Sequence, residues 1–130
     1  ISVFGGFRSP DNMRDGECYD PETNSWTDIP PMKYGRCFFS VAVFNGHIYV
    51  VGGLDVNILN EVERYDPVTE SWTSLKSLDG GRAVATLVVS CGKLFAIGGE
   101  WSFEIGTLPI PVSFSSPVSN LELCFFHFLV

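Results

Sequence analysis

The side chains in this sequence that are best able to bind a metal or act as nucleophile and base are its four cysteines and two histidines. No two cysteines form a Cys-x-x-Cys pair, which is a common signature of zinc sites. His47 and His127 stand in no pattern that is typical of a serine or cysteine nucleophile with its base. We therefore expect neither a zinc site nor a covalent catalyst, and we expect reduced thiols at Cys18, Cys37, Cys91 and Cys124.

Two further groups of residues are of the types found in phosphate-binding loops and in pairs of catalytic carboxylates. Gly52-Gly53 follows an apolar run, as a phosphate-binding loop follows a strand. However, neither G-x-G-x-x-G nor G-x-x-x-x-G-K occurs, and no helical pattern follows the glycines. Glu61 and Glu63 lie two positions apart, so a strand places both carboxylates on one face. We expect that face to be solvated. The sequence thus predicts no enzyme, no cofactor and no metal.

The charge balance limits the kinds of partner that the chain can bind. Its 130 residues contain 8 Lys plus Arg and 15 Asp plus Glu, which gives a net charge of −7. Binding to nucleic acid or to an acidic membrane needs an excess of basic side chains, so neither partner is expected. No secretory signal pattern opens the sequence, and no apolar run approaches the roughly 20 residues that span a bilayer. These features predict a cytoplasmic protein whose partners are proteins.

The strongest signal in the sequence is an internal repeat. Tyr19-Asp20-Pro21 recurs 46 positions later as Tyr65-Asp66-Pro67, and Trp26 recurs as Trp72 with the same spacing. The repeat also includes a Gly-Arg pair and a Gly-Gly pair, at Gly35-Arg36 and Gly81-Arg82, and at Gly5-Gly6, Gly52-Gly53 and Gly98-Gly99. A period of this length suits one four-stranded antiparallel unit with its connections.

Four strands can be placed within one period. Asn45-Gly46 is a hairpin signal between the first and second strands. The second strand is a nearly continuous apolar run, which is typical of a strand buried on both faces. Asp66-Pro67 makes the turn between the third and fourth strands. The predicted strands lie at 37–44, 47–53, 61–65 and 71–75, with a loop at 54–60. The sequence therefore predicts an all-β fold with three strands in its first unit, four in the second and two in the third.

The array of Gly-Gly, a loop, Tyr-Asp-Pro and Trp resembles the kelch repeat, and the stretch 45–67 is most similar to the kelch-like proteins. The resemblance covers residues 1–100. It implies a partial kelch β-propeller of about two to three four-stranded antiparallel blades, whose Tyr and Trp rings anchor each blade against its neighbour. The expected divisions are a partial blade at 1–36, a complete blade at 37–82, the start of a third blade at 83–100 and an atypical C-terminal tail at 101–130.

The resemblance also implies a function. Kelch-like proteins carry a BTB domain that docks a cullin scaffold, while the propeller captures the substrate for ubiquitylation. We therefore expect a protein–protein interaction module, the substrate-recognition part of a cullin-RING ubiquitin ligase adaptor, with cullin reached only through a BTB domain that is absent from this sequence. An actin-binding or scaffolding kelch protein is the alternative, and a fold-sharing enzyme is the least favoured. The remaining propeller blades are expected to be needed for closure.

Loops at one end of a propeller carry recognition, because the strands hold them still. The two loops between second and third strands are 7–16 and 54–60. By the resemblance, positions just after a Gly pair or just after the strand-opening Arg face the ligand, Phe38 and Val84 among them, and Phe38 is the expected hot spot. Arg36 and Arg82 keep a second interpretation, as interblade hydrogen-bond or charge partners. The expected protein-binding residues are Phe7, Arg8, Asn12, Arg36, Phe38, Leu54, Asp55, Asn57 and Arg82.

Overall fold

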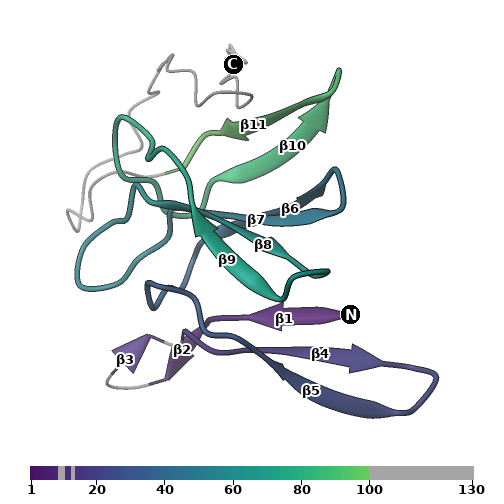
Figure 1. Cartoon of the computed structure of the whole chain (residues 1–130). Helices are drawn as coiled ribbons and strands as arrows, with labels where there is room; N and C mark the ends of the chain where they lie inside the picture. Colours follow the sequence, from purple (N-terminus) through teal and green to yellow (C-terminus); the bar gives the residue numbers. More distant parts are fainter. Residues whose placement is uncertain (9–10, 13, 100–130) are drawn as a thin grey trace, which may run out of the picture.

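Figure 1 shows the computed structural model, which describes residues 1–8, 11–12 and 14–99, with the backbone alone at 7–8 and 11–12. All regular structure in these residues is β-strand, and no helix among them is long and apolar enough to cross a bilayer. The strands are β1 (Ser2–Phe4), β2 (Phe7–Arg8), β3 (Asp11–Asn12), β4 (Gly16–Asp20), β5 (Ser25–Ile29), β6 (Ser40–Phe44), β7 (His47–Val51), β8 (Val62–Asp66), β9 (Ser71–Ser74), β10 (Thr86–Ser90) and β11 (Lys93–Ile97).

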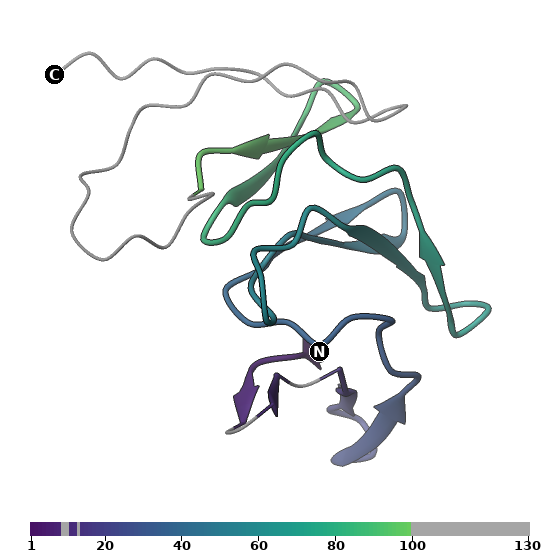
Figure 2. The ribbon, with the colours of Figure 1, turned by 90° about the vertical axis from the view of Figure 1, so that its left-hand side faces the viewer.

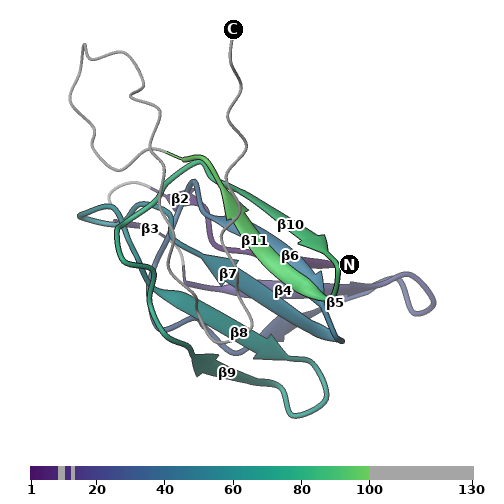
Figure 3. The same ribbon diagram turned by 90° about the horizontal axis from the view of Figure 1, so that it is seen from above.

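The strands form three stacked antiparallel units, which we call blades 1 to 3. Blade 1 has the order β1-β4-β5, with the small β2-β3 hairpin beside it; blade 2 has the order β6-β7-β8-β9; blade 3 is the pair β10-β11. Figures 1 and 2 show the blades one above another in chain order, and Figure 3 shows from above how they overlie each other. The all-β fold of propeller-type blades is confirmed, as are the three, four and two strands; the described blades do not close into a ring.

The third and fourth strands of blade 2 differ from the expectation by one residue at their ends, whereas two other boundaries differ by more, for a physical reason. The first strand of blade 2 begins at Ser40 instead of at residue 37, because Phe38 has a left-handed backbone with φ of 53°. The second ends at Val51, because Gly52 and Gly53 have φ of 62° and 100°, which an extended strand does not allow. The segment 7–16, expected as a loop, contains the β2-β3 hairpin. The tail at 101–130 lies outside the described residues.

The blades pack through two apolar contacts. Between blades 2 and 3, Val51, Val62, Leu78 and Leu94 form a cluster of buried side chains. Between blades 1 and 2 the contact is aromatic, because the Phe4 ring lies edge-on to Tyr65 and Trp72, with ring centroids 6.0 and 5.4 Å apart. The expected interblade anchor is therefore present at Trp72. Its Nε1 also donates a hydrogen bond of 2.7 Å to the carbonyl oxygen of Pro30.

The equivalent tryptophan of blade 1, Trp26, does not pack against a neighbouring blade in the described residues. Trp26 packs on Tyr19 at 5.0 Å between ring centroids, much as Trp72 packs on Tyr65 at 5.1 Å. However, Trp26 is 52% exposed, because no described blade covers its other side. The prediction that both tryptophans are core anchors therefore fails for Trp26 in this structure. The reason lies outside blade 1, since the local geometry of the two rings is the same.

This difference allows a matched pair of substitutions. Trp72→Phe keeps a ring but removes the hydrogen bond to Pro30, so the free energy of unfolding is expected to fall by about 1 kcal/mol. Trp26→Phe is expected to change it by less than about 0.5 kcal/mol, because the indole is half exposed. Urea titration followed by circular dichroism measures both. Equal losses at the two positions would contradict the asymmetry.

Candidate functional site

Two exposed apolar residues lie side by side where the chain enters blades 2 and 3. Phe38 and Val84 are 59% and 61% exposed and occupy equivalent positions in the repeat. Both have a left-handed backbone, with φ of 53° and 58°, which is an outlier for bulky and β-branched side chains. The amide of Val84 donates a 2.8 Å hydrogen bond to the carbonyl of Phe38, so the two strained turns brace one another. The fold thus fixes the backbone at two residues whose apolar side chains are exposed to solvent.

The 52–61 connection lies against this pair. Leu54 exchanges two backbone hydrogen bonds with Cys37, of 3.0 and 2.8 Å, and also pairs with Ile58. The amide of Asp55 donates to the carbonyl of Asn57 at 3.0 Å, so the loop has an ordered tip. These bonds bring together the surface that we call the loop surface, consisting of Phe38, Leu54, Asp55, Val56, Asn57 and Val84.

Sequence reasoning missed one member of the loop surface. Val56 is 89% exposed at the tip of the 52–61 connection. The available signal was an apolar residue directly between two polar ones, Asp55 and Asn57. Leu54 and Asp55 are half-buried and Asn57 is exposed. Leu54 therefore adds apolar area to the loop surface, and Asp55 and Asn57 add polar groups.

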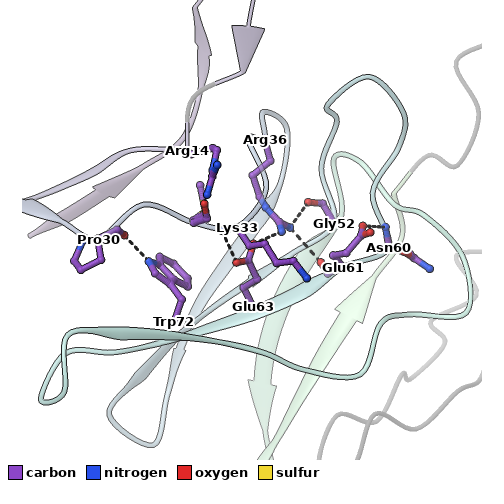
Figure 4. A network of polar contacts seen from close by, with 10 residues as sticks. Arg14, Pro30, Lys33, Arg36, Gly52, Asn60, Glu61, Glu63 and Trp72 are labelled. Carbon is purple, nitrogen blue, oxygen red and sulfur yellow. Dashed lines mark hydrogen bonds and ion pairs between the residues drawn. The ribbon is translucent and has the colours of Figure 1, made fainter.

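Arg36 lies in the interior. It is 0% exposed, and its Nη2 pairs with Oε2 of Glu63 at 2.5 Å (Figure 4). Its Nη1 donates to the carbonyl oxygens of Gly52 and Glu61, at 2.7 and 3.1 Å. Glu63 Oε1 in turn accepts a 2.8 Å hydrogen bond from the backbone amide of Lys33. Burial lowers the pKa of the Arg36 guanidinium, and the charge of Glu63 opposes that shift.

This network corrects the expectation that Glu61 and Glu63 lie on a solvated face. Glu63 is 0% exposed, because the segment that leads into blade 2 covers its face of the sheet. Glu61 is half-buried, and its Oε2 accepts the amide of Asn60 at 3.0 Å. A carboxylate in such a place needs a buried cation, and Arg36 supplies it.

Arg82 occupies the equivalent position in blade 3. It is 9% exposed, its Nη1 donates to the carbonyl of Gly98 at 2.6 Å, and burial lowers the pKa of its guanidinium. Of the two interpretations of Arg36 and Arg82, the structure supports the hydrogen-bond and charge partner, because burial keeps both guanidinium groups from a partner protein. Their predicted direct contact with a ligand is therefore corrected.

The remaining expected residues lie on the β2-β3 hairpin. The backbone pairs Phe7 with Asn12 and Arg8 with Asp11, and Figure 1 shows this hairpin at the same left-hand side as the 52–61 connection. The side chains of Phe7, Arg8 and Asn12 are outside the described part of the structure, so their contacts stay a prediction.

The described residues offer surface for binding and few reactive groups. Cys18, Cys37 and Cys91 are free thiols, as expected, and burial raises the pKa of Cys37, which disfavours the reactive thiolate. Across residues 1–8, 11–12 and 14–99, no group of three or more His, Cys, Asp or Glu side chains is placed to hold a metal ion.

Comparison of the sequence with known protein families identifies the same repeat as a kelch motif. The kelch motif model matches residues 3–33 and 35–78, which is more than half of the chain. The Influenza virus NS1A-binding protein homolog of Xenopus laevis is 47% identical over 53 residues, covering 41% of this chain and 8% of that protein. Kelch-like protein 23 of Homo sapiens is 51% identical over 37 residues, covering 28% and 7%.

A further relative is the Kelch repeat and BTB domain-containing protein 12 of Danio rerio, which is 50% identical over 36 residues, covering 28% of this chain and 6% of that protein. The matched segments thus span less than a tenth of each of these relatives. The family match, the four-stranded blade and the repeated Gly-Gly, Tyr and Trp positions agree with one another: the chain belongs to the kelch-repeat family, in its kelch-like type.

Proposed function

We propose that the loop surface binds a protein partner. The observation that carries the proposal is the pair Phe38 and Val84, two apolar side chains that are exposed and held in left-handed backbone by a hydrogen bond between blades. Such backbone costs about 1–3 kcal/mol per residue and persists mainly where function uses it. A rigid exposed aromatic beside adaptable polar loop residues is a common form of a binding hot spot.

The finer proposal is a role as the substrate-recognition segment of a cullin-RING ubiquitin ligase adaptor in the cytoplasm. Its support is the similarity to kelch-like proteins and to a relative whose name includes a BTB domain. In the longer protein, cullin is reached through such a domain. An actin-binding or scaffolding role is the second candidate. Co-purification of the longer protein with a cullin supports the first, and cosedimentation of the chain with filamentous actin supports the second.

Phe38→Gly is the substitution that tests the loop surface. Glycine accepts the left-handed φ at no steric cost, so the fold is expected to keep or gain stability. Loss of a hot-spot aromatic is expected to weaken partner binding by about 30-fold, the equivalent of about 2 kcal/mol. Proteins captured from cytoplasmic extract by the wild-type chain are compared by quantitative mass spectrometry, and the dissociation constant is then measured with the purified partner.

Val68→Gly is the matched control. Val68 is 89% exposed, and it lies in the turn between β8 and β9, at the opposite end of the strands from the loop surface (Figure 1). Its substitution also removes an exposed apolar side chain, but binding is expected to be unchanged. If Phe38→Gly bound the partner as tightly as Val68→Gly, the loop surface would not be the binding site.

A further inference from the structure

The loops of blades 1 and 2 make the same contacts with the segment that enters the next blade. The amide of Met32 donates to the carbonyl of Arg14 at 2.9 Å, and Nε of Arg14 donates to the carbonyl of Met32 at 2.6 Å. In the same way, the amide of Leu78 donates to the carbonyl of Asn60 at 2.8 Å, and Nδ2 of Asn60 donates to the carbonyl of Leu78 at 3.1 Å. The two places are therefore equivalent in structure as well as in the repeat.

Blade 1 has more basic than acidic residues at this place, which we call the basic region. Arg14 is exposed, and Lys33 is exposed in the segment that enters blade 2 (Figure 4). The Lys33 ammonium lies over the ring of Tyr34, 5.1 Å from its centroid, so the ring helps to fix the position of the charge. Arg8 adds a basic residue on the β2-β3 hairpin. The charged residues of 7–16 and 30–34 are Arg8, Asp11, Arg14, Asp15 and Lys33.

Blade 2 has more acidic than basic residues at the equivalent place, which we call the acidic region. Asp79, which is exposed, occupies the repeat position of Lys33. Asp55 occupies that of Arg8, counted from the Gly-Gly pair that precedes each of them. The charged residues of 54–61 and 76–80 are Asp55, Glu61, Lys76 and Asp79. One backbone arrangement therefore presents opposite charges on neighbouring blades.

Phe38 lies between these two regions. The carbonyl of Arg36 accepts a 3.0 Å hydrogen bond from the amide of Gly6, which directly precedes the β2-β3 hairpin. On the other side, the carbonyl of Phe38 accepts the amide of Val84, and the 52–61 connection pairs with the residue just before Phe38. The exposed apolar pair of the loop surface therefore has the basic region at blade 1 and the acidic region at blade 2.

We propose that the loop surface binds an extended protein segment in which an apolar residue has Asp or Glu on one side and Lys or Arg on the other. This inference rests on the proposed function of the loop surface. The apolar residue packs on Phe38 and Val84, the carboxylate pairs with the basic region, and the cation pairs with the acidic region. A segment with charges of one sign only would meet a like charge at one end, which costs affinity. The surface therefore selects the order of the charges as well as their presence.

The test selects binders of the whole 130-residue chain from a phage-displayed library of random peptides of about 12 residues, which in extended form span about 40 Å. We expect the recovered peptides to share the order acidic, apolar, basic or its reverse. A synthetic copy of one such peptide is then titrated by fluorescence polarisation at low ionic strength. Lys33→Glu and Asp79→Lys are each expected to weaken its binding at least about 5-fold, and less at high salt, where exposed charges are screened.

The double variant Lys33→Glu with Asp79→Lys reverses the charges without changing the net charge. It is expected to prefer, by at least about 5-fold, a second peptide in which the acidic and basic residues are exchanged. A merely structural role for the two residues would not produce this exchange of preference. Glu22→Lys is the matched control for Asp79→Lys, because Glu22 is exposed in the turn between β4 and β5, and it is expected to leave the affinity unchanged.

Phe38→Gly distinguishes failure of this inference from failure of the proposed function. If the recovered peptides need Phe38 but have no charge order, or if the double variant keeps the preference of the wild-type chain, the charge order is overturned and the loop surface stands. If no recovered peptide depends on Phe38, the loop surface itself is overturned, and the charge order with it.

Discussion

Glu63→Ala is expected to lower the free energy of unfolding by about 3–5 kcal/mol, because it leaves Arg36 buried without its counter-charge. Arg36 is 0% exposed in the native blade. The loss is a large part of the about 5–15 kcal/mol that stabilises an ordinary domain. Urea titration followed by circular dichroism measures it.

Glu17→Ala provides the control at the equivalent position of blade 1. The carboxylate there is exposed, so its removal is expected to change the free energy of unfolding by less than about 0.5 kcal/mol. The double substitution Arg36→Met and Glu63→Leu removes both charges and is expected to recover most of the lost stability. Equal losses for Glu17→Ala and Glu63→Ala, or a double variant no better than Glu63→Ala, would show that the ion pair is not the cause.

Gly52→Ala is expected to cost about 3 kcal/mol or more. A Cβ at this position overlaps the carbonyl oxygen of Arg82, and the φ of 62° is unfavourable for any residue with a side chain. The overlap involves backbone on both sides, so neither rotamer change nor side-chain movement relieves it. The same denaturation measurement reports the loss.

Substitution of Gly98 distinguishes the effect of steric overlap from the effect of the left-handed backbone. It has nearly the same backbone, with φ of 69°, but no described atom lies within 4 Å of the place where its Cβ would stand. Gly98→Ala is therefore expected to cost only about 1 kcal/mol, the price of the left-handed conformation. If both substitutions cost the same, contact between blades 2 and 3 would not contribute at Gly52.

Local signals in the sequence were sufficient for the strands of each blade. Asn45-Gly46 predicts the turn between β6 and β7, and the alternation around Val62 predicts β8, because both patterns reflect contacts between near neighbours in the chain. The spacing of the repeat then predicts how many strands each blade contains. These features need no knowledge of how one blade packs on the next.

Burial of polar groups was not predictable in the same way. The two-residue period places Glu61 and Glu63 on one face, but it does not show that the segment containing Lys33 and Arg36 covers that face. The left-handed turn at Phe38 was equally hidden, since no glycine marks it; it is stabilised by a bond to Val84 of the next blade. Both depend on contacts between segments tens of residues apart.

The Arg36–Glu63 pair also has a consequence for the order of events during protein synthesis. The two residues are 27 positions apart, and arginine is made first. At about 5–20 residues per second, the ribosome adds the carboxylate roughly 1–5 s after the guanidinium. During that interval the Arg36 guanidinium has no counter-charge. Burying it between strands would then cost the desolvation free energy of an unpaired cation. The pair therefore delays closure of blade 2 until its third strand, β8, has been translated.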